Sequence, residues 1–233
     1  MRYLIQFKKE GLLRYTSHLD MMRLFQRTFH RAGIALSHSQ GYNPHPKMCF
    51  AQPLSLGYSG TGEYLEIETE EDLDKERLII TLNVLLPQGI SVLNCRSLPQ
   101  GVKSSAASVI FGRYKIYWKT WKRDLAETQD LLDCFLTQKR ILVKKAQKKC
   151  KELREVDIRP MICQLAAQRT EEGGVCFLAL VRTGSEANLN PELLMQALCT
   201  FLETPFQKEE FFICRTGLYK KDKHGQPVDL FHE

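Results

Sequence analysis

Apolar residues recur with two different periods in the first hundred positions, and each period predicts a different element. Polar and apolar residues alternate, as in a half-buried strand, at 3–9 and again at 63–68. Between them, apolar residues at helical spacing run from Leu19 to Ala32, after Ser17 as a helix cap and before Gly33 as its end. The other elements expected in this half are strands at 48–56 and 90–98, a helix at 73–86 and turns at 34–46 and 57–62. Their order is β-α-β-β-α-β, the ferredoxin-like pattern.

The same kind of pattern starts again after a polar stretch at 100–108, which we expect to be a linker. Strands are expected at 109–121, 141–146, 152–158, 175–181 and 211–219, and helices at 124–138, from Pro160 and at 190–203. We therefore predict an α+β protein with two ferredoxin-like (βαββαβ) units in tandem, each an antiparallel sheet with helices on one face. The units are residues 1–99 and 109–220, the second has an insertion after its first helix, and the tail at 221–233 is expected to be loose.

Composition narrows the classes of protein to consider. No apolar run approaches the ~18 residues of a membrane span, and the N-terminal residues lack the pattern of a signal peptide. The eight cysteines show no C-x-x-C spacing, so we expect reduced thiols and no metal centre in this chain. A cytoplasmic location without a membrane partner follows as an expectation.

The positive charge of the chain is concentrated at its start. Residues 1–50 hold eight lysines and arginines and two acids, which accounts for the whole net charge of +6, since the remaining residues hold 25 of each sign. A basic region confined to one segment is the usual mark of a protein that binds a polyanion. The alternative is a solvated charged surface without a ligand.

One face of the first helix carries an uninterrupted row of cations. Arg23, Arg27, His30 and Arg31 lie at i, i+4, i+7 and i+8, opposite the apolar face, with no acid among them. Guanidinium groups pair with phosphate oxygens through two parallel hydrogen bonds. The row therefore indicates contact with an anion such as a nucleic-acid backbone.

Two further features in this region carry candidate chemistry. His18, in the first turn of the helix with Asp20, is a candidate general base or phosphate donor, or it orders that turn only. The loop at 38–47 places donor side chains between two prolines that stiffen it, which is typical of a functional loop, although a turn network that satisfies its own backbone is the alternative. Its candidate residues are Ser39, Gln40, Tyr42, Asn43, His45 and Lys47.

The second half contains weaker candidates. The basic stretch at 139–151 is expected to be a solvated turn, because nearby acids balance it. Asp157 and Arg159 flank one strand position and favour an ion pair over a site, and Arg215 is noted for the same reason. Aromatic residues gather at 114–121, where they either pack in the core or stack on nucleobases.

These motifs resemble those of the bacterial radical SAM-linked protein family, a domain of unknown function. The stretches that carry the resemblance are Gly11-Leu-Leu-Arg-Tyr-Thr-Ser-His-Leu-Asp-Met-Met-Arg23, Arg31-Ala-Gly33, Ser39-Gln-Gly-Tyr-Asn-Pro-His-Pro-Lys47, Pro53-Leu-Ser-Leu-Gly57, Val156-Asp-Ile-Arg-Pro160 and Arg215-Thr-Gly217. The resemblance implies a radical SAM enzyme as partner, encoded beside this protein or fused to it. The iron–sulfur cluster and S-adenosylmethionine would belong to that partner, because this chain lacks the cysteine motif. Family neighbours imply RNA metabolism.

Three hypotheses for function follow. The first is an RNA-binding accessory protein for the modification or processing of tRNA or rRNA by a radical SAM enzyme. Its RNA-binding candidates are Arg14, Arg23, Arg27, His30, Arg31, Ser39, Gln40, Tyr42 and Asn43. The second is a metal-independent endoribonuclease with His18 and His45 in proton transfer, Asp20 beside them, and Lys47 or Arg23 as the cation. The third is a purely structural partner of the radical SAM enzyme.

Overall fold

The computed structural model describes residues 1–146 and 153–231. The chain forms two compact units, one of Met1–Ile110 with Cys214–Glu233 and one of Phe111–Ile213. Both units combine helices with strands, and the described residues contain five α-helices, so the fold class is α+β. The sheet is mixed, because antiparallel pairs occur together with a parallel one.

The described part of the first unit contains six strands or parts of strands, three α-helices and a 3-10 helix. Its elements are β1 (Arg2–Lys9), the 3-10 helix η1 (Gly11–Tyr15), α1 (His18–Arg31), β2 (Met48–Phe50), β3 (Ser59–Glu68), α2 (Lys75–Leu85), β4 (Ile90–Leu98), α3 (Ser105–Ser108), most of β10 (Phe211–Lys221) and β11 (Pro227–Asp229). The strands lie in the order β4-β1-β3-β10, with β2 paired to β3 and β11 paired to β10. The β3–β10 pair is parallel and the other pairs are antiparallel.

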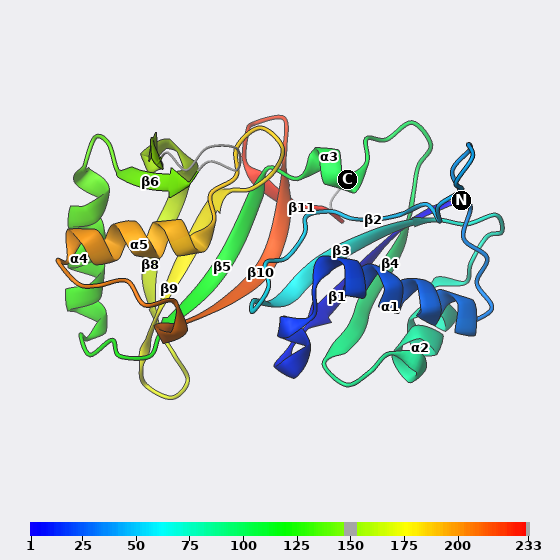
Figure 1. Cartoon of the computed structure of the whole chain (residues 1–233), viewed down its shortest axis with the longest axis horizontal. Coiled ribbons are helices and arrows are strands. Elements are labelled where there is room, and N and C mark those ends of the chain that lie inside the picture. Colours follow the sequence, from blue (N-terminus) through cyan, green and yellow to red (C-terminus); the bar gives the residue numbers. More distant parts are fainter. Residues whose placement is uncertain (147–152, 232–233) are drawn as a thin grey trace. The chain divides into compact units, whose positions relative to one another are not determined.

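Both faces of this sheet are covered, and the two faces form separate cores. On one face, α1 and α2 lie next to each other over β1 and β4, as Figure 1 shows, and Phe25 and Leu82 are fully buried there. On the other face, the C-terminal segment packs around Leu4 and Leu218, and Leu230 is buried in this second core. The period-2 alternation of β1 produces both surfaces, because successive side chains point to opposite faces.

Helix α1 begins and ends where its residue types predict. The Ser17 side chain accepts a hydrogen bond from the Asp20 amide at 3.2 Å, which caps the first turn. Met21, Phe25 and Phe29 form the buried face. Gly33 follows with a φ of +70°, a left-handed conformation that glycine adopts without strain. The arginines on the opposite face are therefore held on a rigid element.

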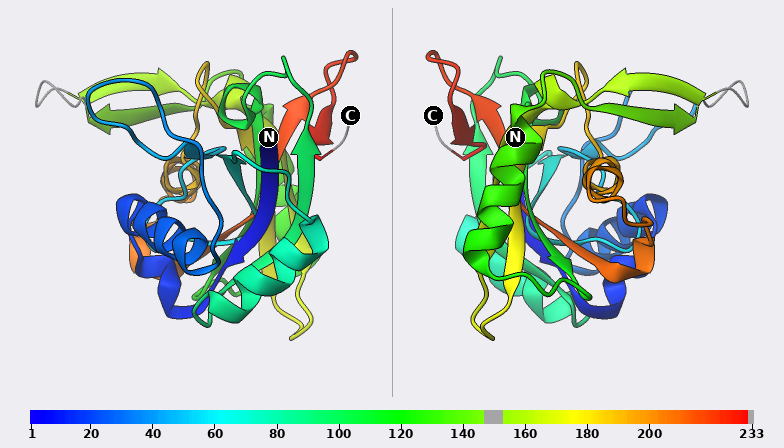
Figure 2. Two further views of the ribbon diagram at one scale, coloured as in Figure 1. Left: turned by 90° about the vertical axis from the view of Figure 1, so that its right-hand side faces the viewer. Right: turned by 90° about the vertical axis from the view of Figure 1, so that its left-hand side faces the viewer.

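The second unit contains an antiparallel sheet and a separate two-stranded ribbon. Its elements are β5 (Phe111–Trp118), α4 (Leu125–Thr137), β6 (Leu142–Ala146), β7 (Leu153–Asp157), the 3-10 helix η2 (Arg159–Met161), β8 (Ile162–Arg169), β9 (Val175–Arg182), α5 (Pro191–Phe201) and the 3-10 helix η3 (Lys208–Glu210). The sheet order is β5-β9-β8, and β6 pairs only with β7 (Figure 2). The expected Lys-rich turn lies partly at 147–152, outside the described residues.

Several expected boundaries differ from the structure in the first unit. The strand expected at 48–56 is limited to β2. The turn expected at 57–62 is shorter than expected, because the chain turns at 56–57 and β3 already begins at Ser59. The glycines there allow close packing, since a Cβ on Gly62 would lie 2.5 Å from the Thr216 carbonyl oxygen. The expected linker contains α3, whose Ser105 amide donates to Glu66 at 2.7 Å.

The C-terminal segment was expected to be loose, and the structure differs there as well. Pro227–Asp229 pairs with β10, and Leu230 is 3% exposed. The Arg96 guanidinium donates to the Leu230 carbonyl oxygen at 2.5 Å. The C-terminal segment therefore belongs to the first unit, where it covers apolar surface. Its polar composition did not indicate this packing.

A tandem ferredoxin-like arrangement is not established. The second unit contains β8, a strand that was not expected, and its β6–β7 ribbon stands apart from the β5-β9-β8 sheet. Strand β8 escaped the sequence analysis because Ile162–Arg169 is rich in glutamine and alanine, which have low strand propensity. Pairing with β9 along its length overrides that preference.

Candidate functional site

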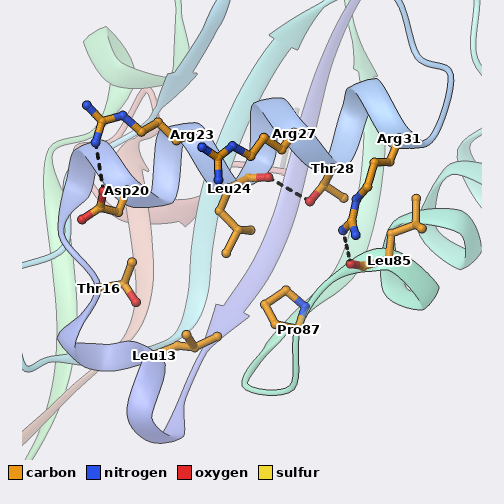
Figure 3. Close-up of a pocket in the computed structure, with 10 residues that line it drawn as sticks. All are labelled: Leu13, Thr16, Asp20, Arg23, Leu24, Arg27, Thr28, Arg31, Leu85 and Pro87. Carbon is orange, nitrogen blue, oxygen red and sulfur yellow. Dashed lines mark hydrogen bonds and ion pairs between the residues drawn. The ribbon is translucent and has the colours of Figure 1, made fainter.

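A groove runs along the exposed face of α1 in the first unit. It has a volume of about 630 Å³. Its lining combines side chains of α1 with the 3-10 helix before it and the end of α2, as Figure 3 shows. The lining residues are Leu13, Thr16, Asp20, Arg23, Leu24, Arg27, Thr28, Arg31, Leu85 and Pro87. We call this feature the α1 groove; it has an apolar floor and a row of three guanidinium groups.

The three arginines of the α1 groove differ in their partners. Arg23 pairs with Asp20 at 3.1 Å, and Arg31 donates to the Leu85 carbonyl oxygen at 2.6 Å. Arg27 has no hydrogen-bond or ion-pair partner among the described residues, and Figure 3 shows its guanidinium over the groove. Exposed pairs such as Arg23–Asp20 are weak, so all three guanidinium groups remain available to an anion.

Asp20 has a structural role in this groove. Its carboxylate accepts a hydrogen bond from the Ser17 hydroxyl at 2.7 Å and one from Arg23. The Ser17 hydrogen bond, followed by Arg23, lowers the pKa of Asp20. The carboxylate is therefore ionised at neutral pH, and it holds the hydroxyl of the capping residue Ser17 and orients Arg23.

Of the RNA-binding residues predicted in the 3-10 helix and α1, Arg14 and His30 lie outside the lining of the groove. His30 is exposed in the last turn of α1. Arg14, in the 3-10 helix, donates to the Tyr15 hydroxyl at 2.8 Å and lies 4.8 Å over the Tyr15 ring. The helical spacing placed His30 with the arginines, but the groove follows the i, i+4, i+8 row alone.

The loop at 38–47 closes on itself. The Ser39 amide donates to the His45 carbonyl oxygen at 2.8 Å, and the His45 amide donates to the Ser39 hydroxyl at 3.0 Å. Gln40, Tyr42, Asn43 and His45 are exposed. Lys47 pairs with Glu68 at 2.7 Å. Ser39 and Lys47 therefore shape and anchor the loop, whereas the exposed side chains between them are accessible to a partner.

The structure does not bring His18 and His45 together. His18 lines a small cavity beside Glu63, and its ring lies 5.5 Å from that of Phe50. The His45 loop is anchored at the other end of β3, where the Glu68 amide donates to the Lys47 carbonyl oxygen. Glu63 and Glu68 are five positions apart along β3, which corresponds to a distance of about 17 Å along the strand. A shared centre for two imidazoles has no support in this geometry.

The most buried charged side chain of the first unit is Arg215, which is 2% exposed. Its guanidinium binds both oxygens of Glu63, with Nε at 2.8 Å from Oε1 and Nη2 on Oε2, and it donates to the Gln52 carbonyl oxygen at 2.6 Å. Glu63 and Lys9 are each 3% exposed, and the Lys9 ammonium donates to the Thr16 carbonyl oxygen at 2.8 Å. We call these three residues the buried charge cluster.

The sequence pattern indicated Arg215 but not the other two members of the buried charge cluster. A signal for Lys9 was present, because strand alternation places it on the same face as Ile5 and Phe7. Glu63 had no comparable signal, because its pairing with Arg215 joins residues 152 positions apart. Burial lowers the pKa of Lys9 and nearby Arg215 adds to this, while Glu63 opposes it.

In the second unit, Asp157 and Arg159 stabilise the chain locally. The Asp157 carboxylate accepts hydrogen bonds from the Ile141 and Arg159 amides, both at 3.0 Å, and these lower its pKa. The Arg159 side chain donates to the Leu136 carbonyl oxygen at 3.1 Å. Among the aromatic residues of this unit, Trp118 is 7% exposed, and its ring centroid lies 4.8 Å from that of Trp121. This packing is typical of core residues.

The described residues contain no group of three or more His, Cys, Asp or Glu side chains that would hold a metal ion. Within the same residues, every helix is too short or too polar to cross a membrane.

Comparisons with known proteins bear on the fold and the family. No curated protein matches this chain. The solved structure entitled "Crystal Structure of a Cbf5-Nop10-Gar1 Complex" is similar over 95% of this chain and 50% of that one, with a TM-score of 0.50 and 11% identity. The chain thus spans about half the length of that protein, and the likeness concerns the fold alone. A family model described as "Uncharacterized protein conserved in bacteria (DUF2344)" matches residues 2–191, and the chain belongs to that family.

Proposed function

We propose that this protein is an RNA-binding accessory protein whose α1 groove contacts the phosphate backbone. The observation that carries the proposal is the row of Arg23, Arg27 and Arg31 along one groove of about 630 Å³. Arg27 in particular has no partner among the described residues. The planar guanidinium fork is pre-organised for two parallel hydrogen bonds to phosphate, so less side-chain entropy is lost for each hydrogen bond that forms.

The spacing of the row supports a nucleic-acid strand over a single small anion. Four residues of α-helix rise about 6 Å, so the three arginines present charge at regular steps along the groove. Successive phosphates of one strand repeat in a similar way. The net charge of +6 from residues 1–50 adds a longer-range attraction for a polyanion.

The test is the affinity of the protein for RNA at several salt concentrations. Arg27→Glu is expected to weaken binding about tenfold or more, because a hydrogen bond to a charged group contributes ~1.5–3 kcal/mol. Arg27→Glu is also expected to reduce the steepness of the plot of log K, the association constant, against log salt concentration by about one unit or more. Arg77→Glu is the matched control, since Arg77 is an exposed arginine on α2 of the same unit.

Binding that is insensitive to salt, or equal losses in Arg27→Glu and Arg77→Glu, would contradict the proposal. The second outcome would mean that net charge, and not the α1 groove, accounts for the affinity.

The proposal extends to a partner. The resemblance to radical SAM-linked proteins supports a radical SAM enzyme that supplies the iron–sulfur cluster and S-adenosylmethionine for RNA modification or processing. Affinity purification from the native cells tests this part: an iron–sulfur enzyme with the radical SAM cysteine motif is expected to co-purify. A cytoplasmic location fits this role, and the seven described cysteines are free thiols.

We also propose that the first unit alone is ferredoxin-like. Its elements β1 to β4 and α1 to α2 follow the β-α-β-β-α-β order, and the antiparallel neighbours β4-β1-β3 with β2 on β3 support this description.

A further inference from the structure

A small cavity opens beside the buried charge cluster of the first unit. Its polar lining consists of Lys9, His18, Gln52 and Glu63. Its space of about 20 Å³ is enough for one water-sized atom. Lys9 and Glu63 form its buried side, whereas His18 is exposed to solvent. A group that enters from solvent therefore meets a buried ammonium.

The charges around this cavity are not balanced within the cluster. Two cations, Lys9 and Arg215, share the single carboxylate of Glu63. Both oxygens of that carboxylate are engaged by Arg215, at Nε and at Nη2. Within the described part of the chain, Lys9 has one hydrogen bond, to the Thr16 carbonyl oxygen, although an ammonium has three donors. The cluster therefore has one positive charge more than Glu63 can neutralise, and a buried excess charge is costly, so an anion beside Lys9 would stabilise the cluster.

We propose that this cavity is an oxyanion site in which Lys9 and His18 bind one oxygen of a phosphate or carboxylate group. The rest of the ligand would lie outside, over the exposed His18. The cavity accepts a single oxygen, and we take a terminal anionic group as the source of that oxygen. The inference does not depend on the α1 groove, because none of the polar residues that line this cavity lines that groove.

The experiment titrates inorganic phosphate, and separately acetate, into the full chain by calorimetry at constant ionic strength. Lys9→Met is expected to weaken phosphate binding about tenfold, in line with the loss of a charged hydrogen bond. Lys8→Met is the control, because Lys8 is the neighbouring lysine and pairs with Glu10 at 2.8 Å. Arg77→Glu is expected to leave phosphate binding unchanged, because Arg77 is an exposed cation of α2 that lines neither this cavity nor the α1 groove.

A second measurement does not require Lys9→Met to fold. The imidazole resonances of His18, identified by their loss in His18→Ala, are expected to shift on saturation with phosphate in the unaltered protein. Failure of phosphate and acetate to bind saturably, equal affinities in Lys9→Met and Lys8→Met, or unmoved His18 resonances would each overturn the proposal.

The source of the anion is then resolved with two oligonucleotides that differ at one end. Tighter binding of the 5′-phosphorylated form than of the 5′-hydroxyl form, with the difference lost in Lys9→Met, identifies a nucleic-acid terminus as the ligand. Equal binding of the two forms, together with saturable phosphate or acetate binding that Lys9→Met weakens, identifies a free small anion. Both results support an oxyanion site.

Discussion

Among single residues, Glu63 is expected to stabilise the first unit through its buried carboxylate. Glu63→Gln removes the carboxylate that Lys9 and Arg215 share, and these two residues are 3% and 2% exposed. Breaking a buried ion pair on one side costs ~3–5 kcal/mol, because the partner charge stays buried. We expect a loss of that size in the free energy of unfolding, measured by urea denaturation at neutral pH.

The control for this prediction lies on the same strand. Glu68 pairs with Lys47 at 2.7 Å, but both side chains are about a third or more exposed, at 34% and 42%. Exposed pairs contribute about 1 kcal/mol or less, so Glu68→Gln is expected to change stability little. Equal losses in the two variants would refute the distinction drawn between the buried and the exposed pair.

Among the elements, the contact between β3 and β10 depends on a glycine. In Gly62→Ala the new methyl group would meet the Thr216 carbonyl oxygen at 2.5 Å, and backbone cannot move aside as a side chain does. Overpacking of this kind costs ~1–3 kcal/mol, and we expect a lower urea midpoint. Gly174→Ala is the control, because its methyl group would meet the rotatable Thr170 hydroxyl at 3.3 Å. A Gly62→Ala midpoint no lower than that of Gly174→Ala would show that the two strands can separate without cost.

The elements also show what the sequence can and cannot predict. Helix α1 was predictable, because its cap at Ser17, its apolar spacing and its end at Gly33 are all local signals. The beginning of β3 was not, because Gly60 and Gly62 are equally typical of a turn, and their role depends on a strand far along the chain.

The candidate site divides in the same way. The arginine row follows from helical spacing and lies together in the α1 groove. The floor of that groove includes Leu85 and Pro87, which no local pattern connects to α1. The buried charge cluster likewise joins β1, β3 and β10, and only the alternation of β1 at Lys9 pointed to it. The faces of a single helix or strand can thus be predicted from the spacing of its residues. Contacts between elements that are distant in the sequence become visible only in the folded structure.

Across the whole molecule, buried thiols in both units set a limit on stability at high pH. Burial raises the pKa of Cys95 in β4 to about 11, partly opposed by Lys75. Burial also raises the pKa of Cys199 in α5 to about 11, and Glu210 adds to this. The pKa of an exposed cysteine thiol is 9.0 by comparison. The folded protein therefore keeps both thiols protonated at a pH where the unfolded chain has already lost these protons.

The sign of the effect follows from this difference. Below about pH 9 both states hold the protons and the contribution to stability is complete, and between about pH 9 and 11 the unfolded state is progressively favoured. We expect the free energy of unfolding, measured by urea denaturation under reducing conditions, to fall over this window. The fall is expected to be smaller in a Cys95→Ala/Cys199→Ala variant than in the unaltered protein, whereas Cys134→Ala, at an exposed position, should leave it unchanged. The same fall in all three proteins would mean that other groups, and not these thiols, control the alkaline limit.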